Sequence, residues 1–307
     1  LTESALLKGA RHYFEENGFH EVTTPHITRA TGACENIATM FQLDFFSQRS
    51  YLVQTGQLYL EAWIPRLKRV WCIGPSFRAE PYVDERHLCE FPLVEMELEC
   101  DFHQLLGHIE GSICSMVNQA GKDAKDDLEA LNIDTQALRD LRPPFRKVTY
   151  TQAIEDLRAR YGLEWGADLK AEHERYLVEL YGNQPLFITH YPEPIKFFNM
   201  KNNEEDPRVV NSADLILPYS GEAVGSAERE HRPDRLMEKL RKSSMLRLLE
   251  ARGGGIQDFD WYIQQLRRES VPHAGCGVGL NRVTQCVLRE TDIRRTTPFP
   301  LNMATLL

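Results

Sequence analysis

The chain has 307 residues, which is enough to bury a substantial core in one large or two medium domains. Hydrophobic residues make up 42% and charged residues 26%, and no apolar run reaches membrane-spanning length, so we expect a globular protein with no membrane partner. The net charge of −9 argues against a broad basic surface for nucleic acid, and seven cysteines without metal-ligand spacing predict reduced thiols in the cytoplasm.

The first hundred residues alternate between helical and extended patterns. Apolar residues at helical spacing predict a helix over 4–17 that Gly18 ends, and a short strand over 19–22 runs into Pro25. A further strand is expected at 51–53.

A strand, a charged loop and a second strand are predicted between residues 70 and 99. The first strand covers 70–73, which is apolar and β-prone. In the second, Glu95, Glu97 and Glu99 alternate with apolar residues, a pattern typical of a half-buried antiparallel strand.

The loop between these strands carries Arg78, Glu80, Arg86, His87 and Phe91. Two guanidiniums and an imidazole can clamp a polyphosphate, because a planar fork matches phosphate oxygens. A carboxylate can accept a hydrogen bond from an exocyclic amine, and an aromatic ring can carry a purine. The set therefore indicates an ATP site, whereas composition alone would favour a solvated hairpin with surface ion pairs.

The second part of the chain mixes helices and strands. We expect a mainly helical connecting region over 102–185. Beyond it we expect strands at 186–189 and 190–200, a strand pair at 209–222, helices at 236–251 and 260–268, and glycines leading into a helix at 275–283.

Two carboxylates in this part are candidate ligands of Mg²⁺. Asp214 and Glu222 lie eight positions apart across a predicted turn, and hard oxygen donors near a polyphosphate suit this ion. With this spacing alone, unrelated surface residues would be the more common case. Lys196 has two readings, since it could face an anionic substrate or extend to solvent.

Four segments together resemble one enzyme family. FRAE…RHLCEF at 77–91 looks like motif 2 of the class II aminoacyl-tRNA synthetases, in their aspartyl/asparaginyl branch. GFHEVTTP at 18–25 is similar to motif 1, EAVGSAER at 222–229 to an asparaginyl signature, and GCGVGLNR at 275–282 to motif 3. The resemblance implies an α+β class II catalytic domain, with an antiparallel six- or seven-stranded sheet flanked by helices. It also implies ATP, Mg²⁺, a small amino acid and a homodimer.

The resemblance also implies roles at the nucleotide end of the site. Arg78 would contact the α-phosphate and the substrate carboxylate, and Arg282 would lie against the γ-phosphate or over the adenine. These two are the implied catalytic residues, acting by position and charge. Asp214 and Glu222 would hold the metal. The full implied ATP-binding set is Arg78, Glu80, Arg86, His87, Leu88, Phe91, Glu222, Gly279 and Arg282.

The implied amino-acid-binding residues are Glu35, Gln54, Gln57, Arg78, Gly225, Glu228 and Arg229. Arg229 would hold the side-chain oxygen of the substrate. Four segments depart from the family. Asn36-Ile37 replaces small residues after Glu35, and Gly225-Ser226-Ala227 stands where the family has Gly-Gly-Ser. Glu228 replaces glutamine, and Asn281 replaces an acid beside Arg282. Glu228 would disfavour a substrate carboxylate unless it points away, and Arg282 would lose an orienting partner.

Three functions stay open from the sequence. We expect 1–307 to form a single catalytic domain without the N-terminal OB-fold that reads the anticodon, although Leu1 leaves a missing upstream segment possible. The favoured reading is an enzyme that adenylates an aspartate- or asparagine-like acid and passes it to ammonia or another small nucleophile, like the related archaeal asparagine synthetase. The alternatives are a tRNA ligase, with tRNA not indicated by charge, and a non-catalytic binding module.

Overall fold

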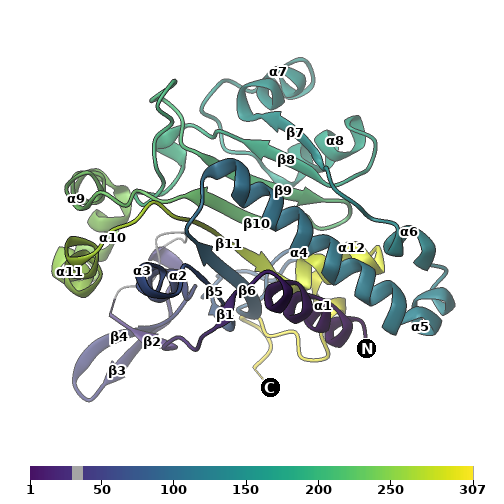
Figure 1. Ribbon diagram of the computed structural model, residues 1–307, viewed down its shortest axis with the longest axis horizontal. Helices are drawn as coiled ribbons and strands as arrows, with labels where there is room; N and C mark the ends of the chain where they lie inside the picture. The colour runs from purple at the N-terminus through teal and green to yellow at the C-terminus, as the bar shows by residue number, and fades with distance from the viewer. Residues whose placement is uncertain (30–36, 307) are drawn as a thin grey trace.

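An eight-stranded sheet forms the centre of the computed structural model, which describes residues 1–29 and 37–306 (Figure 1). The two outermost pairs, β1–β5 and β7–β8, are parallel, and all neighbours between them are antiparallel. In spatial order the strands are β1 (His20–Glu21), β5 (Arg69–Phe77), β6 (Glu90–Leu98), β11 (Ala274–Gly279), β10 (Gly221–Glu228), β9 (Ser212–Leu217), β8 (Leu186–Thr189) and β7 (Arg146–Thr149). The predicted α+β class is confirmed, and the sheet exceeds the expected six or seven strands.

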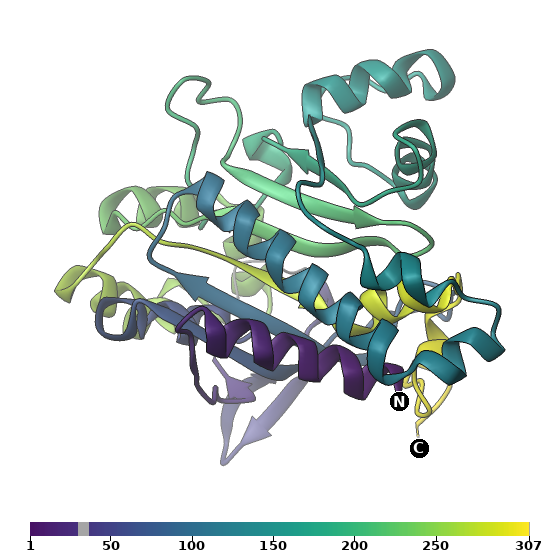
Figure 2. The ribbon, with the colours of Figure 1, turned by 45° about the vertical axis from the view of Figure 1, so that its right-hand side comes forward.

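Three helices cover one face of this sheet: α1 (Thr2–Glu16), α4 (Phe102–Asp123) and α12 (Leu280–Leu288). α1 and α4 run side by side across it (Figure 2). They approach closely at Gly9, whose carbonyl accepts a hydrogen bond from the Ser115 hydroxyl at 2.8 Å. The apolar residues of β6, including Met96 and Leu98, point into this layer and form the main core.

The remaining elements surround the sheet. A small sheet joins β2 (Ile27–Thr28), β4 (Gln48–Leu52) and β3 (Gln42–Phe45). The other helices are α2 (Gln57–Glu61), α3 (Ile64–Leu67), α5 (Lys125–Ala130), α6 (Thr135–Arg139), α7 (Tyr150–Tyr161), α8 (Ala171–Leu180), α9 (Pro233–Lys242), α10 (Ser244–Ala251) and α11 (Asp260–Arg268), with single turns η1 (Ile37–Thr39), η2 (Glu193–Ile195), η3 (Ile256–Phe259) and η4 (Ile293–Thr296). Within the described residues, no helix is long and apolar enough to cross a membrane.

Two predicted elements differ from the structure. The expected strand at 190–200 is a series of turns around η2, because Pro192 and Pro194 cannot donate to a sheet ladder. The expected helix at 236–251 divides into α9 and α10 at Ser243. The side chain of this serine accepts a hydrogen bond from the Leu246 N–H and starts the second helix.

β6 is buried on both faces, which corrects the half-buried strand predicted from its alternation. Glu95 and Glu97 are only 4% and 1% exposed. They project from the face opposite α1 and α4, where α2 packs against β6 and Lys196, Phe197 and Met200 line the same pocket. The position of two buried carboxylates on that face marks the region of the candidate site.

The contact between α1 and α4 yields the first prediction. A Cβ at Gly9 would lie 2.5 Å from the Ser115 carbonyl oxygen and 2.7 Å from the Met116 Cα, both backbone atoms that cannot move alone. We expect Gly9→Ala to lower the free energy of unfolding by about 1–3 kcal/mol. The measurement is urea denaturation followed by circular dichroism.

Gly107→Ala is the matched control, because Gly107 is likewise a helical glycine, in α4, and a Cβ there would meet nothing within 4 Å. Alanine favours helix by about 1 kcal/mol over glycine. The control should therefore be neutral or slightly stabilising, and an equally tolerated Gly9→Ala would contradict the close approach of the two helices.

Candidate active site

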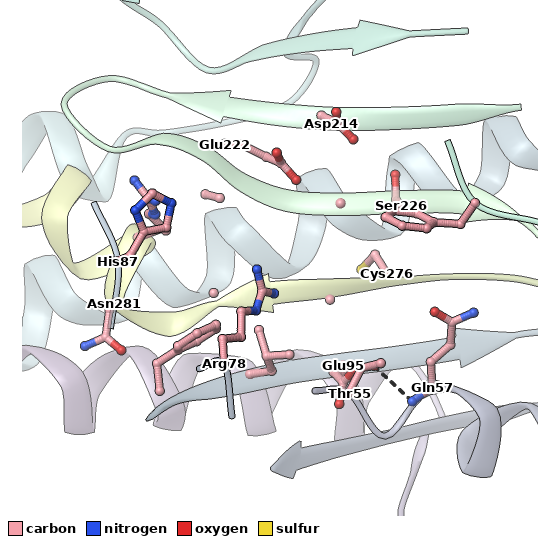
Figure 3. Close-up of a pocket in the computed structure, with 18 of the residues that line it drawn as sticks. Thr55, Gln57, Arg78, His87, Glu95, Asp214, Glu222, Ser226, Cys276 and Asn281 are labelled. Atoms are coloured by element: carbon pink, nitrogen blue, oxygen red, sulfur yellow. Dashed lines mark hydrogen bonds between the residues drawn. The ribbon is translucent and has the colours of Figure 1, made fainter. Parts of the chain in front are cut away.

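The candidate site is a pocket on the face of the sheet opposite α1 and α4, and its floor is made of glycines (Figure 3). Gly275, Gly277 and Gly279 alternate with residues of β11 that point into the core. Four residues are paired in a row across neighbouring strands of the sheet, in the order Glu95, Gly277, Gly225 and Asp214. Two glycines thus lie between two carboxylates, and the absent side chains leave room for a ligand. The glycine-rich segment is a sheet strand rather than a phosphate-binding loop.

Basic side chains gather at one end of this pocket. Arg78, Arg86, His87 and Arg282 line it, together with Leu88 and Phe91. The Arg78 guanidinium lies over the Phe91 ring, 5.0 Å from its centre. His87 Nδ1 lies 2.8 Å from an oxygen of Asp84. This end carries the charges and the aromatic surface that a nucleoside polyphosphate requires.

Arg282 is held by backbone carbonyls. Its Nη2 donates to the Arg86 carbonyl at 2.7 Å, and its Nη1 donates to the Ser220 carbonyl. Burial, with repulsion from Arg86, lowers the pKa of Arg282 to about 10. The acid that Asn281 replaces is therefore not the only means of orientation, because the two carbonyls hold Arg282. Asn281 instead donates through Nδ2 to the Thr296 hydroxyl at 3.0 Å.

Asp214 and Glu222 both point into the pocket from neighbouring strands (Figure 3). Asp214 is buried and pairs with Lys196 Nζ at 2.6 Å, while Glu222 is exposed at the pocket edge. Lys196 thus lines the pocket instead of extending to solvent, and a contact with an anionic substrate stays a prediction. The two carboxylates offer hard oxygen donors from neighbouring strands, which is the ligand chemistry that Mg²⁺ takes.

The other end of the pocket contains a buried ion pair. Arg229 donates from Nη2 and Nε to Glu97 at 2.5 and 3.1 Å, and both side chains are almost fully buried. Burial raises the pKa of Glu97, and the positive charge of Arg229 opposes this rise. Glu95 accepts hydrogen bonds from the Thr55 hydroxyl and the Gly56 N–H, and burial raises the pKa of Glu95 as well.

A second buried network lies behind this pair. Glu61 accepts hydrogen bonds from Gln57 Nε2 at 2.7 Å and from the Tyr262 hydroxyl at 2.5 Å, and it lies 3.0 Å from His273 Nε2. Glu61, Glu97 and His273 are close enough to hold a metal ion. Arg229 and a protonated His273 already balance the two carboxylates, so charge neutrality here requires no metal.

Most of the expected site residues meet in this pocket, but several do not. Gln54 is buried elsewhere and donates to the Thr39 hydroxyl at 3.1 Å. Glu228 points away and pairs with Lys201 at 2.7 Å. Glu80 lies outside the lining, beside the Tyr82 hydroxyl, whose pKa it raises. Glu35 lies outside the described residues.

The structure also adds residues that the sequence reasoning missed as site components. Glu95, Glu97 and Thr55 line the pocket, and Glu61 and His273 support it. The alternation of Glu95 and Glu97 after the charged loop was the available signal. It was interpreted as a solvent-facing side of the strand, because the covering layer comes from distant parts of the chain.

An antiparallel sheet with a glycine floor, an arginine-rich polyphosphate end and a carboxylate pair defines a class II synthetase catalytic domain. The family model for class II tRNA synthetases (D, K and N) matches residues 1–303, and the chain belongs to this family, in its asparaginyl/aspartyl branch. It is therefore an ATP-dependent ligase of the aminoacyl-adenylate-forming class, which uses ATP and Mg²⁺.

Several relatives and solved structures are similar to the whole chain. The asparagine–tRNA ligase of Pyrococcus abyssi (strain GE5 / Orsay) is 36% identical over 307 residues, covering 99% of this chain and 68% of the relative. The asparaginyl-tRNA synthetase of Pyrococcus horikoshii, solved with asparaginyl-adenylate, has a TM-score of 0.90 at 36% identity, with 99% and 68% covered. An aspartyl-tRNA synthetase from Entamoeba histolytica has a TM-score of 0.78 at 28% identity, with 99% and 58% covered.

The Arg229–Glu97 pair yields a prediction on stability. Glu97→Ala leaves a buried guanidinium without its partner, and we expect a loss of about 3–5 kcal/mol in the free energy of unfolding. The control is Glu99→Ala, which removes the glutamate directly after the end of β6. Glu99 is exposed and lies 3.9 Å from Lys68, so its removal should change stability by less than about 0.5 kcal/mol. Similar losses for both variants in urea denaturation would contradict the buried pair.

The His273–Glu61 pair yields a prediction on pH dependence. Burial alone would lower the pKa of His273, but the Glu61 carboxylate outweighs it, so the pKa lies above the ordinary 6.5. The pair therefore contributes stability that is fully present below pH 6.5 and is lost as the pH rises through the folded-state pKa.

We expect the difference in unfolding free energy between wild type and His273→Gln to be largest near pH 6 and to shrink toward pH 9. Urea denaturation across this range measures it. A difference that grows with pH would mean that His273 is neutral in the folded protein.

Proposed function

We propose that this chain activates asparagine with ATP and transfers the asparaginyl group to tRNA. Aminoacyl-adenylate formation follows from family membership, whereas the amino acid and the acceptor are the proposed part. The asparagine–tRNA ligases among the relatives support tRNA as acceptor over ammonia, the reading that the sequence departures favoured. The same proposal includes a homodimer, which the family resemblance implies, and a cytoplasmic location, which the cysteine pattern predicts.

We choose asparagine over aspartate because the positive charge of Arg229 is already balanced by a carboxylate. Its guanidinium is already paired with Glu97, and Glu95 lies on the same side of the pocket. A free carboxylate would therefore enter a site whose positive charge is neutralised. A carboxamide can instead offer its oxygen to the guanidinium and its NH₂ to a carboxylate. Glu228, which pairs with Lys201, takes no part in this choice.

In the proposed first step, the asparagine carboxylate attacks the α-phosphorus of ATP and pyrophosphate leaves. The nucleophile is already ionised, so the step needs no general base. Arg78 orients the carboxylate and the α-phosphate, and Arg86, His87 and Arg282 neutralise the outer phosphates. Asp214 and Glu222 would hold Mg²⁺, which supplies further positive charge. In the second step, a ribose hydroxyl of tRNA attacks the acyl carbon and AMP leaves.

ATP–pyrophosphate exchange without tRNA tests the first step. Asparagine should support exchange, and aspartate should do so at least about tenfold less efficiently. Exchange driven by aspartate instead would contradict the proposed amino acid. No exchange with either acid, by folded protein that binds ATP, would favour the non-catalytic binding module.

Acylation assays test the acceptor. With radiolabelled asparagine, tRNA should become labelled and periodate-treated tRNA should not, because periodate destroys the terminal ribose diol. Free asparagine formed from aspartate, ATP and ammonia, without labelling of tRNA, would establish the ammonia reading and contradict the proposal.

A further inference from the structure

Glu174 lies on α8, in the connecting region between the recognised motifs, and it contacts two elements of the site. Its Oε2 lies 3.1 Å from Arg86 Nη2, and the same oxygen accepts a hydrogen bond from the Glu222 N–H at 3.2 Å. The Glu174 side chain is 8% exposed, and that of Arg86 is 30% exposed. One buried carboxylate thus joins the polyphosphate end to the strand that carries the candidate metal ligand.

These contacts form a closed ring with Arg282. Arg282 donates to the carbonyls of Arg86 and Ser220, and Ser220 is the last residue of the turn between β9 and β10. Glu222, near the start of β10, returns to Arg86 through Glu174. Four segments that lie far apart in the sequence therefore hold one another at the polyphosphate end: the loop after β5, α8, the β9–β10 turn and α12.

The local backbone is shaped to admit this ring. Gly221 has a φ of +76°, and a Cβ there would lie 2.5 Å from Glu174 Oε2 and 3.2 Å from both Arg86 Nη atoms. Glycine is thus required both by the left-handed conformation and by the closeness of the ion pair.

The charges explain why a carboxylate is needed at this point. Arg86 lowers the pKa of the buried Arg282, and Glu174 opposes that effect. Two neighbouring guanidiniums repel each other, and a long, half-exposed arginine loses rotamer freedom when it is fixed. The negative charge of Glu174 offsets this repulsion. Its carboxylate accepts a hydrogen bond from Nη2 of Arg86. The other donors of the Arg86 guanidinium can then bind phosphate oxygens.

We infer that Glu174 is a positioning residue for adenylate formation, which holds Arg86 and Glu222 in the geometry that the polyphosphate and its metal require. The inference rests on the proposed function, because it places the polyphosphate of ATP beside Arg86. Glu174 acts through these two residues and transfers no proton or group itself.

Two substitutions at Glu174 separate position from charge. Glu174→Gln keeps an oxygen that accepts from Arg86 and Glu222 but removes the negative charge, whereas Glu174→Ala removes both. The matched control is Glu179→Ala, at an exposed position of the same helix. ATP–pyrophosphate exchange is measured with ATP and Mg²⁺ varied separately, and thermal unfolding is measured for each variant.

For Glu174→Ala we expect kcat at saturating ATP to fall by about tenfold or more, and the Mg²⁺ concentration for half-maximal rate to rise. Glu174→Gln should fall between wild type and Glu174→Ala, because it keeps the acceptor oxygen but loses the charge that offsets the repulsion between Arg86 and Arg282. Glu179→Ala should match wild type. A merely structural role would lower the melting temperature without moving the Mg²⁺ dependence. That result would overturn the inference.

Three other outcomes are equally decisive. A lower KM for ATP with unchanged kcat in Glu174→Ala would show that Glu174 only competes with phosphate for Arg86, and this would also overturn the inference. Wild-type protein without exchange would refute the proposed function before any variant is compared. Wild-type exchange with a silent Glu174→Ala would refute the inference alone.

Discussion

Charge compensation in a poorly solvated space is the constraint on which this structure depends. The face of the sheet that carries the pocket buries Glu95, Glu97, Asp214 and Arg229, and an unpaired ion in such a place would cost several kcal/mol. Each is therefore matched: Glu97 by Arg229, Asp214 by Lys196, and Glu95 by hydroxyl and N–H donors. The glycines of β11 make this possible, because any side chain at Gly275 would occupy the position of the Glu97 carboxylate.

The same constraint links the two ends of the site. At one end Arg282 and Arg86 are balanced by Glu174, and at the other Arg229 is balanced by Glu97. A ligand that enters must fit this balance, so a polyphosphate suits the first end and a neutral carboxamide the second. Ligand recognition and folding thus depend on the same ion pairs. Removing one partner of a pair changes both the stability of the fold and the ligand that the site accepts.

The sequence predicted most strongly what is local. The helix α1 and the strands β5 and β6 follow from periodicity. Arg78, Arg86, Arg229 and Arg282 follow from contiguous motifs, and these four arginines line the pocket. The direction of Glu228 was not predictable, because Lys201 and Asn211 reach it from another segment. Burial of Glu95 and Glu97 depends on layers contributed by distant residues. Glu174 lies in no motif, and its partner Arg86 is 88 positions away in the chain.

The central claim is that Glu97 neutralises Arg229 and so selects a neutral side chain. The most direct test is the ratio of kcat/KM for asparagine to that for aspartate in ATP–pyrophosphate exchange, compared between wild type and Glu97→Gln. The glutamine keeps an acceptor for Arg229 but removes the charge. The account predicts that the ratio falls by about tenfold or more, because an uncompensated guanidinium attracts a carboxylate. An unchanged ratio in an active, folded variant would contradict it.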